Sequence, residues 1–297
     1  MTIAETPAAV LKRVASLPCW RGKVEPRPLE GGLSNKNFIV DDGGEKFVVR
    51  VGGDVAEHRI VRSRDIAVSN AAYRAGLSPE PVFALADVQV IRFVEGDTLR
   101  EADVAEAEML ARIVPLVRTC HQELAGHLAD DEVCFDALKA CQSYGKTLVD
   151  TGYRLARDIP ALLELGQKMA DAGAGYGACF CHNDLLAANF IDDGRRLWLI
   201  DWEYGGLNNP LFDLANLASN NKFSRDTERS LLELYFDRSP DDTLWQSFLS
   251  MKVLSLLREA MWSMTAEKYS DLDIDYAAYT DEQRIRLSAA QADLKGS

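Results

Sequence analysis

One stretch of the chain, residues 181–204, constrains the fold more than any other. It reads C-H-N-D-L-L-A-A-N-F-I-D-D-G-R-R-L-W-L-I-D-W-E-Y. Two short apolar runs, 190–191 and 197–200, flank an Asp193-Gly194 pair, and Asp-Gly between apolar runs is a strong hairpin signal. The pattern predicts a hairpin that places Asp201 beside Asn189 at its open end. Asp184 would lie one short loop upstream of that end.

Three converging oxygen-bearing side chains suit a hard cation, because Mg²⁺ takes oxygen ligands and pairs carboxylates with substrate phosphates. In phosphoryl transfer one Asp accepts the proton of the attacking hydroxyl, while an Asn and a second Asp hold Mg²⁺. The step from Asp184 to Asn189 has the spacing of a kinase catalytic loop. His-Asn-Asp alone is a weak signal, so the hypothesis depends on the ordered combination.

The stretch resembles the signature of the choline/ethanolamine kinase family, within the wider aminoglycoside-phosphotransferase-like group that shares the protein-kinase fold. The matching residues are His182-Asn183-Asp184, Asn189, Ile200-Asp201-Trp202-Glu203-Tyr204 and the run 209–216. The resemblance implies that Asp184 is the catalytic base. It also implies that Mg²⁺ is bound by Asn189, Asp201 and Glu203, and that Asp213 supports the loop by accepting hydrogen bonds.

The fold that this resemblance implies is α+β and bilobal, with a small antiparallel β-sheet lobe and a larger, mainly helical lobe. Val94-Glu95-Gly96 is a credible hinge. We therefore expect a nucleotide-binding lobe over residues 1–95 and a catalytic and acceptor-binding lobe over residues 96–297. Backbone groups of residues 91–94 would meet the adenine.

The nucleotide phosphates would lie against a glycine-containing turn and a strand. The turn holds Gly31, Gly32, Ser34 and Asn35, and glycine lets backbone N–H groups approach phosphate oxygens, although a lone glycine pair is more often an ordinary hairpin turn. In the strand 46–51 a period of two puts Arg50 on one face with Val48. The resemblance implies that Arg50 binds the phosphates and pairs with Asp65, a shorter acid than the Glu of the family.

Hydrophobic periodicity and breakers predict the remaining elements. We expect a helix within residues 1–24 that stops at Pro18, a helix from Asp65 to Arg74, and strands at 81–85 and 88–93. An amphipathic helix should cover 105–124, kinked or broken at Pro115. Two helices should fill 135–173, a strand 178–181, and further helices 212–266. His182 is expected to brace the backbone, and the other histidines show no partner pattern.

The acceptor pocket is less clear from the sequence. A quaternary ammonium is held by aromatic faces with acids nearby, and the resemblance suggests Tyr204, Trp262 and Tyr276, although large aromatics on helices are often core residues. Glu259 stands where the family often has another aromatic, and Asn220 where some members have an acid. Choline and ethanolamine are favoured, and thiamine or another amino alcohol stays open.

Charge and cysteine content limit the partners and the setting. The formal net charge is −13 and the pI about 4.8, which disfavours a nucleic-acid or anionic-membrane surface and suits a cationic small molecule. No stretch has the pattern of a signal peptide or a membrane span. Six cysteines lie without disulfide or zinc spacing, so we expect reduced thiols in a reducing cytoplasm; they are Cys19, Cys120, Cys134, Cys141, Cys179 and Cys181.

Together these observations predict an ATP-dependent, Mg²⁺-requiring phosphotransferase that acts on the hydroxyl of a small cationic alcohol, with choline or ethanolamine favoured. Two alternatives remain. The same fold could phosphorylate thiamine, an aminoglycoside or a sugar, or it could bind nucleotide without catalysis as a pseudokinase. The intact set of Asp184, Asn189 and Asp201 argues against the pseudokinase. The sequence does not indicate the oligomeric state.

Overall fold

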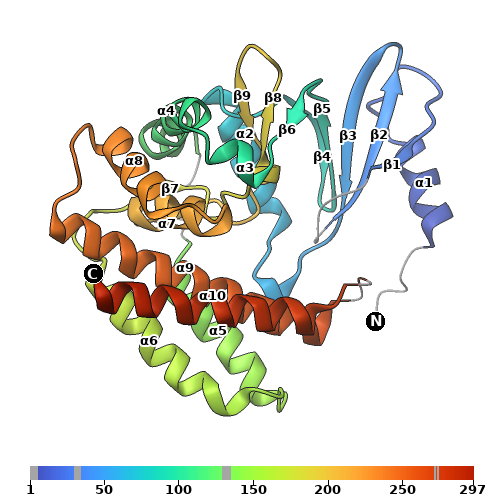
Figure 1. Ribbon diagram of the computed structural model, residues 1–297. Helices are drawn as coiled ribbons and strands as arrows, with labels where there is room; N and C mark the ends of the chain where they lie inside the picture. The colour runs from blue at the N-terminus through green and yellow to red at the C-terminus, as the bar shows by residue number, and fades with distance from the viewer. Residues whose placement is uncertain (1–5, 30–34, 129–134, 271, 273) are drawn as a thin grey trace.

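Alternating apolar residues near the N-terminus form an antiparallel sheet, shown in blue and cyan in Figure 1. The structure is a computed structural model, and it describes residues 6–29, 35–128, 135–270, 272 and 274–297. The five-stranded sheet has the order β1-β2-β3-β5-β4, and the side chains of Phe47, Val49 and Val51 pack beneath it. Its strands are β1 (Arg27–Leu29), β2 (Lys36–Asp42), β3 (Glu45–Val51), β4 (Pro81–Leu85) and β5 (Val88–Arg92).

Two helices accompany the sheet, and both differ in extent from the prediction. Helix α1 (Pro7–Ala15) begins after Thr6, whose hydroxyl caps its start, and the chain leaves the helix at Ser16, slightly before Pro18, where the helix was predicted to stop. Helix α2 (Arg62–Arg74) begins three residues before Asp65. The reason is that the Asp54 carboxylate accepts the N–H of Arg62 at 2.8 Å and so satisfies the first turn.

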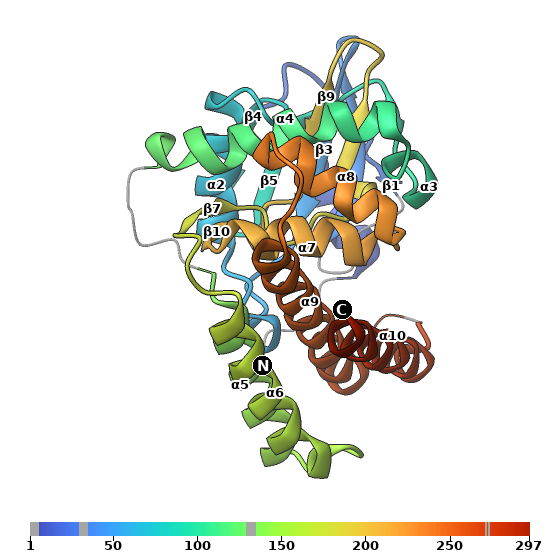
Figure 2. The same ribbon diagram turned by 60° about the vertical axis from the view of Figure 1, so that its left-hand side comes forward.

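The helical part surrounds one long buried helix, α9 (Asp242–Tyr269), most of whose central residues are buried. Helices α5, α6, α7 and α10 all pack on α9, and Figure 2 shows α5 and α6 side by side below the rest. Predicted helices in 135–173 and 212–266 are thus confirmed. The other helices are α3 (Glu101–Val104), α4 (Ala107–Glu123), α5 (Ala137–Asp150), α6 (Ile159–Ala172), α7 (Pro210–Asn220), α8 (Arg225–Phe236) and α10 (Tyr276–Gly296).

Proline 115 does not break its helix. Helix α4 runs through Pro115 from Ala107 to Glu123, so of the two predicted outcomes the break is wrong and the kink stays a prediction. Its buried side chains, among them Ile113, Val114 and Val117, lie in the main core. Their burial outweighs the one backbone hydrogen bond that proline cannot donate.

The predicted hairpin is present, in β8 (Phe190–Asp192) and β9 (Leu197–Leu199). Phe190 faces Leu199 and Asp192 faces Leu197. Beyond the ladder, the N–H of Ile200 donates to the carbonyl of Asn189 at 3.0 Å, so Asn189 lies beside the residues that lead into Asp201, as predicted. Strand β7 (Cys179–Cys181) precedes the hairpin and pairs with β10 (Gly206–Asn208).

The proposed lobe boundary at residue 95 remains a prediction. Strand β5 ends at Arg92, and β6 (Asp97–Thr98) already pairs with β8. Four short 3₁₀ turns complete the described elements: η1 (Ala56–His58), η2 (Leu124–His127), η3 (Ala156–Asp158) and η4 (Ala187–Asn189). Within the described residues, no helix is both long and apolar enough to cross a lipid bilayer.

Candidate active site

A cleft of about 1130 Å³ brings together residues from the sheet and from the helical part. The sheet contributes Val48 and Arg50, and the segment after β5 contributes Phe93 and Val94. The predicted catalytic and metal-binding residues also line it, namely Asp184, Asn189, Asp201 and Glu203. The expected convergence of the loop and the hairpin on one open cleft is therefore observed.

The loop that carries Asp184 is held from behind by a buried carboxylate. Asp213, in the first turn of α7, accepts hydrogen bonds from the N–H of His182 at 2.9 Å and of Asn183 at 2.7 Å. Asn183 takes a φ of 66°, a left-handed conformation that Asn adopts more readily than most residues. The structural task that the resemblance implies for Asp213 is thus confirmed.

His182 braces the same loop, as expected. Its Nε2 lies 3.0 Å from the carbonyl oxygen of Ile200, and its Nδ1 accepts the N–H of Asp184 at 3.3 Å. The ring is fully buried and lies against Trp202, with the ring centres 4.6 Å apart. Because both nitrogens contact the backbone, His182 joins the loop to the end of the hairpin.

The side-chain amide of Asn189 is oriented by a hydrogen bond to the backbone. Its Nδ2 donates to the carbonyl of Asp184 at 2.8 Å, which leaves its Oδ1 as the atom that can act as a ligand.

Burial raises the pKa of Asp184 to about 7, with Arg258 lowering it and Glu259, Asp201 and Glu203 raising it further. A carboxylate with that pKa can exchange a proton near neutral pH.

Arg258, on α9, is the largest omission of the sequence analysis. Its side chain is 2% exposed, and its guanidinium donates to the carbonyl of Asn183 at 2.9 Å. It also lies 3.3 Å from Asp184 Oδ1 and 2.9 Å from Glu259 Oε2. Burial alone would lower the pKa of Arg258, but the two acids outweigh it and hold the pKa above its ordinary value. An Arg-Glu pair inside an apolar helical run was the available signal, since buried charges need partners.

On the other side of the cleft, Arg50 pairs with Asp201. The expected partner, Asp65, is 3.8 Å away and lies closer to Arg62, at 3.2 Å. The predicted Arg50–Asp65 ion pair is therefore present, although each residue has a nearer partner. Asp65 has a short side chain, and Arg62 lies one helical turn from it on α2.

Arg62 is a second residue that the sequence analysis left without a role. It is 4% exposed, and its guanidinium lies 2.9 Å from Glu203 Oε2. Glu203, predicted as a metal ligand, is therefore already held by a cation. Of the predicted phosphate-binding turn, Asn35 lines the cleft, while Gly31, Gly32 and Ser34 lie outside the described residues.

The aromatic residues predicted for the acceptor also line the cleft. The indole N–H of Trp262 donates to the hydroxyl of Tyr204 at 3.0 Å, and Trp262 meets Tyr276 edge to face with ring centres 6.2 Å apart. His58 lies 4.9 Å from the Trp262 ring and is a third residue the sequence did not single out. Burial lowers the pKa of His58 to about 4, so its ring is neutral near pH 7.

The two departures from the family pattern have different positions. Glu259 lines the cleft and accepts a hydrogen bond from the hydroxyl of Tyr279 at 2.7 Å. Asn220 is buried in α7, where its side chain donates to Asn216 at 3.3 Å, and it is not among the described residues that line the cleft. Of the two, Glu259 can influence the acceptor directly.

Comparison with known proteins agrees with this geometry. Residues 27–251 match the family described as choline/ethanolamine kinase, over more than half of the chain. Protein LicA of Haemophilus influenzae is 28% identical over 83% of this chain and 75% of its own length, and a probable ethanolamine kinase of Arabidopsis thaliana is 24% identical over 84% and 75%. The crystal structure of a choline/ethanolamine kinase family protein from Mesorhizobium loti has a TM-score of 0.76 at 23% identity, covering 95% of this chain and 93% of that one. The chain belongs to the choline/ethanolamine kinase family and is a small-molecule kinase with a protein-kinase-like fold.

Proposed function

We propose that this kinase transfers the terminal phosphoryl group of ATP to the hydroxyl of a small cationic amino alcohol, choline or ethanolamine. The observation that carries the proposal is the position of Asp184. Its carboxylate shares one cleft with the oxygen ligands of Asn189 and Asp201 and with the aromatic side chains of Trp262 and Tyr276. A base, a metal-binding pair and an acceptor pocket are the parts that phosphoryl transfer to an alcohol requires.

The donor atoms on the nucleotide side fit Mg²⁺. Asp201 and Glu203 offer carboxylate oxygens and Asn189 an amide oxygen, which are the hard ligands that Mg²⁺ takes together with phosphates. Bound there, Mg²⁺ would neutralise charge on the phosphates. Burial alone would lower the pKa of Arg50, but Asp201, Asp65 and Glu203 hold it above its ordinary value, so Arg50 stays charged for binding phosphate.

In the proposed reaction the residues of the chain position the reactants. Asp184 orients the acceptor hydroxyl and accepts its proton as the new O–P bond forms. Arg258 holds the Asp184 carboxylate in place, and Asp213 and His182 fix the loop that carries it. Most of the acceleration in such enzymes comes from positioning and electrostatics, which explains why the base is so firmly held.

The acceptor cation would lie between aromatic faces and Glu259. The guanidinium of Arg258 is already 4.9 Å from the centre of the Tyr204 ring, so Tyr204 interacts with a cation of the protein itself. We therefore assign binding of the acceptor's cationic group to Trp262, Tyr276 and Glu259, and neutral His58 lines the same pocket without adding charge. Aromatic faces that hold a cation contribute about 0.5–2 kcal/mol each.

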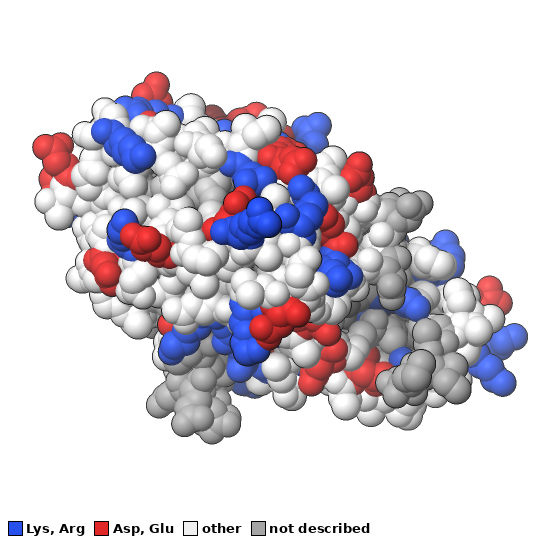
Figure 3. All heavy atoms as spheres, turned by 90° about the horizontal axis from the view of Figure 1, so that it is seen from below, with Lys and Arg blue, Asp and Glu red and all other residues white. Residues whose placement is uncertain are grey.

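Charge on the surface agrees with a small-molecule substrate. On the face that Figure 3 shows, the basic and acidic side chains of the described residues are interspersed rather than gathered into one basic area. A net charge of −13 also disfavours polyanionic partners. The reducing cytoplasm remains the expected setting, since the five cysteines among the described residues are free thiols.

Coupled ATP turnover with choline, ethanolamine, thiamine and an aminoglycoside, measured side by side, tests the proposal. We expect choline or ethanolamine to have a kcat/KM at least about tenfold above the others, a difference of about 1.4 kcal/mol. Asp184→Ala serves as the background control. A preference for thiamine or the aminoglycoside would contradict the assigned acceptor, and no ATP consumption with any alcohol would contradict the kinase assignment.

A further inference from the structure

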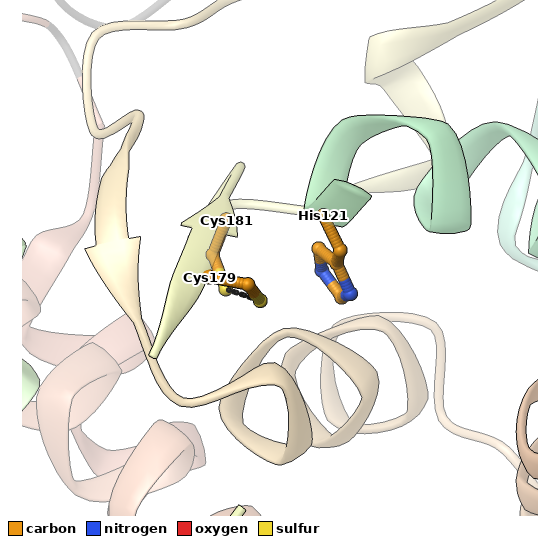
Figure 4. A group of neighbouring side chains, drawn as sticks. All are labelled: His121, Cys179 and Cys181. Atoms are coloured by element: carbon orange, nitrogen blue, oxygen red, sulfur yellow. Dashed lines mark hydrogen bonds between the residues drawn. The ribbon is translucent and has the colours of Figure 1, made fainter. Parts of the chain in front are cut away.

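Behind the catalytic loop, three side chains of metal-binding type lie together. They are His121, near the end of α4, and Cys179 and Cys181, on β7, and their ligand atoms all lie within 4.8 Å of one another. Figure 4 shows the imidazole and the two thiols directed into a common space from the two elements. The three residues are absent from the described lining of the active-site cleft.

The thiols have the geometry of two corners of a tetrahedral site. Alternate residues of a strand point to the same side, and the sulfur atoms of Cys179 and Cys181 are 3.6 Å apart. A Zn–S bond of about 2.3 Å in a tetrahedron requires a sulfur–sulfur edge of about 3.8 Å. The strand therefore presents the sulfurs at nearly the required separation without backbone movement.

The imidazole of His121 has a carboxylate partner of the kind found at metal sites. His121 Nε2 lies 3.0 Å from Asp213 Oδ2, and a carboxylate on one ring nitrogen commonly directs the other toward a metal. That other nitrogen, Nδ1, now lies 2.7 Å from the hydroxyl of Tyr235. A cation would take the place of this hydroxyl contact.

We propose that His121, Cys179 and Cys181 bind a soft divalent cation of the Zn²⁺ class, with the fourth position open to water. Three protein ligands and one water are a common set for zinc. Cys179 is half-buried, which gives the ion a path from solvent, while Cys181 is fully buried. On binding, each S–H bond is replaced by an S–Zn bond and the proton on His121 Nδ1 is displaced as well; these protons leave to solvent, with no change of oxidation state.

The types of ligand also indicate which cation would bind. Soft thiolate ligands select Zn²⁺ over the Mg²⁺ that the active site would use.

The site lies one carboxylate away from the catalytic loop. Asp213 contacts His121 with the same Oδ2 that accepts the N–H of His182. A bound cation would therefore fasten β7 to α4 through side chains that also hold the loop. We expect occupancy to raise the Tm, because a ligand that binds only the folded chain stabilises it by mass action.

Metal titration of the reduced full-length chain tests this inference. Zn²⁺ would be titrated against a chromogenic chelator, with Mg²⁺ in excess to occupy oxygen sites, and Co²⁺ would be used for absorption spectra. We expect one Zn²⁺ to bind per chain, a thiolate-to-cobalt charge-transfer band in the Co²⁺ spectrum, and a higher Tm with the metal bound. In Cys179→Ser the affinity for Zn²⁺ should be at least about tenfold lower, because a ligand is lost.

Two variants serve as matched controls. Cys19→Ser removes a thiol far from the cluster, and Asp201→Asn removes a carboxylate of the active site; both should bind Zn²⁺ as the wild type does. Kinase turnover of Cys179→Ser without Zn²⁺ would show that this variant is folded. The test therefore does not require a substitution of Cys181, which is buried. The proposal would be overturned by unchanged Zn²⁺ affinity in Cys179→Ser or by loss of Zn²⁺ binding in Asp201→Asn. It would also be overturned if the mass of the chain were two hydrogens lower, which would show a Cys179–Cys181 disulfide that excludes the metal.

Discussion

The guanidinium of Arg258 lies 3.3 Å from Oδ1 of Asp184, so the carboxylate proposed as the catalytic base is held by a buried cation. Arg258 also contacts the carbonyl of Asn183 and the carboxylate of Glu259. Asp184 thus has a fixed position and a pKa set by two opposing influences, burial that raises it and Arg258 that lowers it.

Replacing Arg258 should change the pH dependence of the reaction. The base works deprotonated, so kcat/KM rises with pH through the pKa of Asp184, about 7 in the wild type. In Arg258→Met the lost cation raises that pKa, so the rise should move to higher pH, and a shift of one pKa unit would lower the rate at pH 7 by about fivefold. Arg258→Lys keeps a charge and should restore part of the rate. An unchanged pH profile in a folded Arg258→Met variant would show that Arg258 does not set the pKa.

Glu259 should select for a charged acceptor. In Glu259→Gln we expect the KM for choline or ethanolamine to rise about tenfold with kcat changed less, because the acid attracts the cation in ground and transition states alike. The neutral choline isostere 3,3-dimethylbutanol provides the comparison, since its KM should not change. Tyr279→Phe, which removes only the hydroxyl that donates to Glu259, is the matched control. An equal rise for the neutral isostere would contradict the role.

His58 should make the fold sensitive to mild acid. Its pKa is lowered to about 4 in the folded chain against about 6.5 when unfolded. The unfolded state therefore binds more protons between these values, and stability falls as the pH drops from 6.5 toward 4, by up to about 1.4 kcal/mol per pH unit. Urea unfolding at pH 7 and pH 5 should show a smaller loss for His58→Phe than for the wild type. Equal losses would contradict the lowered pKa.

Arg62 should be required for stability. It lies 3.2 Å from Asp65 and 2.9 Å from Glu203, and all three side chains are buried or nearly so. Arg62→Gln removes a positive charge that balances the carboxylates of Asp65 and Glu203. Losing one partner of a buried ion pair lowers the free energy of unfolding by about 3–5 kcal/mol. Arg64→Gln, on the same helix, is the control and should cost less than about 1 kcal/mol. Similar unfolding midpoints for the two variants would show that the network contributes little.

The sequence allowed the catalytic hairpin to be predicted almost residue by residue. Asp193-Gly194 fixes the turn, and the alternation of apolar residues fixes the register, so the position of Asn189 beside the end of β9 followed from local rules. The alternation along β3 likewise put Arg50 on the cleft side. Such features depend on neighbours in the chain.

Residues whose partners are distant in the sequence could not be found in this way. Arg258 meets Asp184 across 74 positions and Arg62 meets Glu203 across 141. His121 contacts Asp213, which lies 92 positions later in the chain. The Cys179-x-Cys181 pair does not have the spacing of a zinc motif, and only the folded structure places His121, on a helix, beside it. The unbroken α4 and the exact ends of α1 could not be predicted for a related reason, since tertiary packing and caps override local propensity.

The proposed function depends on two roles, Asp184 as the base and Asp201 as a ligand of the metal that bears the phosphates. Both roles are tested by the steady-state turnover of Asp184→Ala and Asp201→Ala with choline and ethanolamine, together with their thermal unfolding. Both variants should fold with a Tm within a few degrees of the wild type and lose turnover by about 10³-fold or more, the range expected for loss of a general base. Near-normal turnover in either folded variant would contradict the role of that residue.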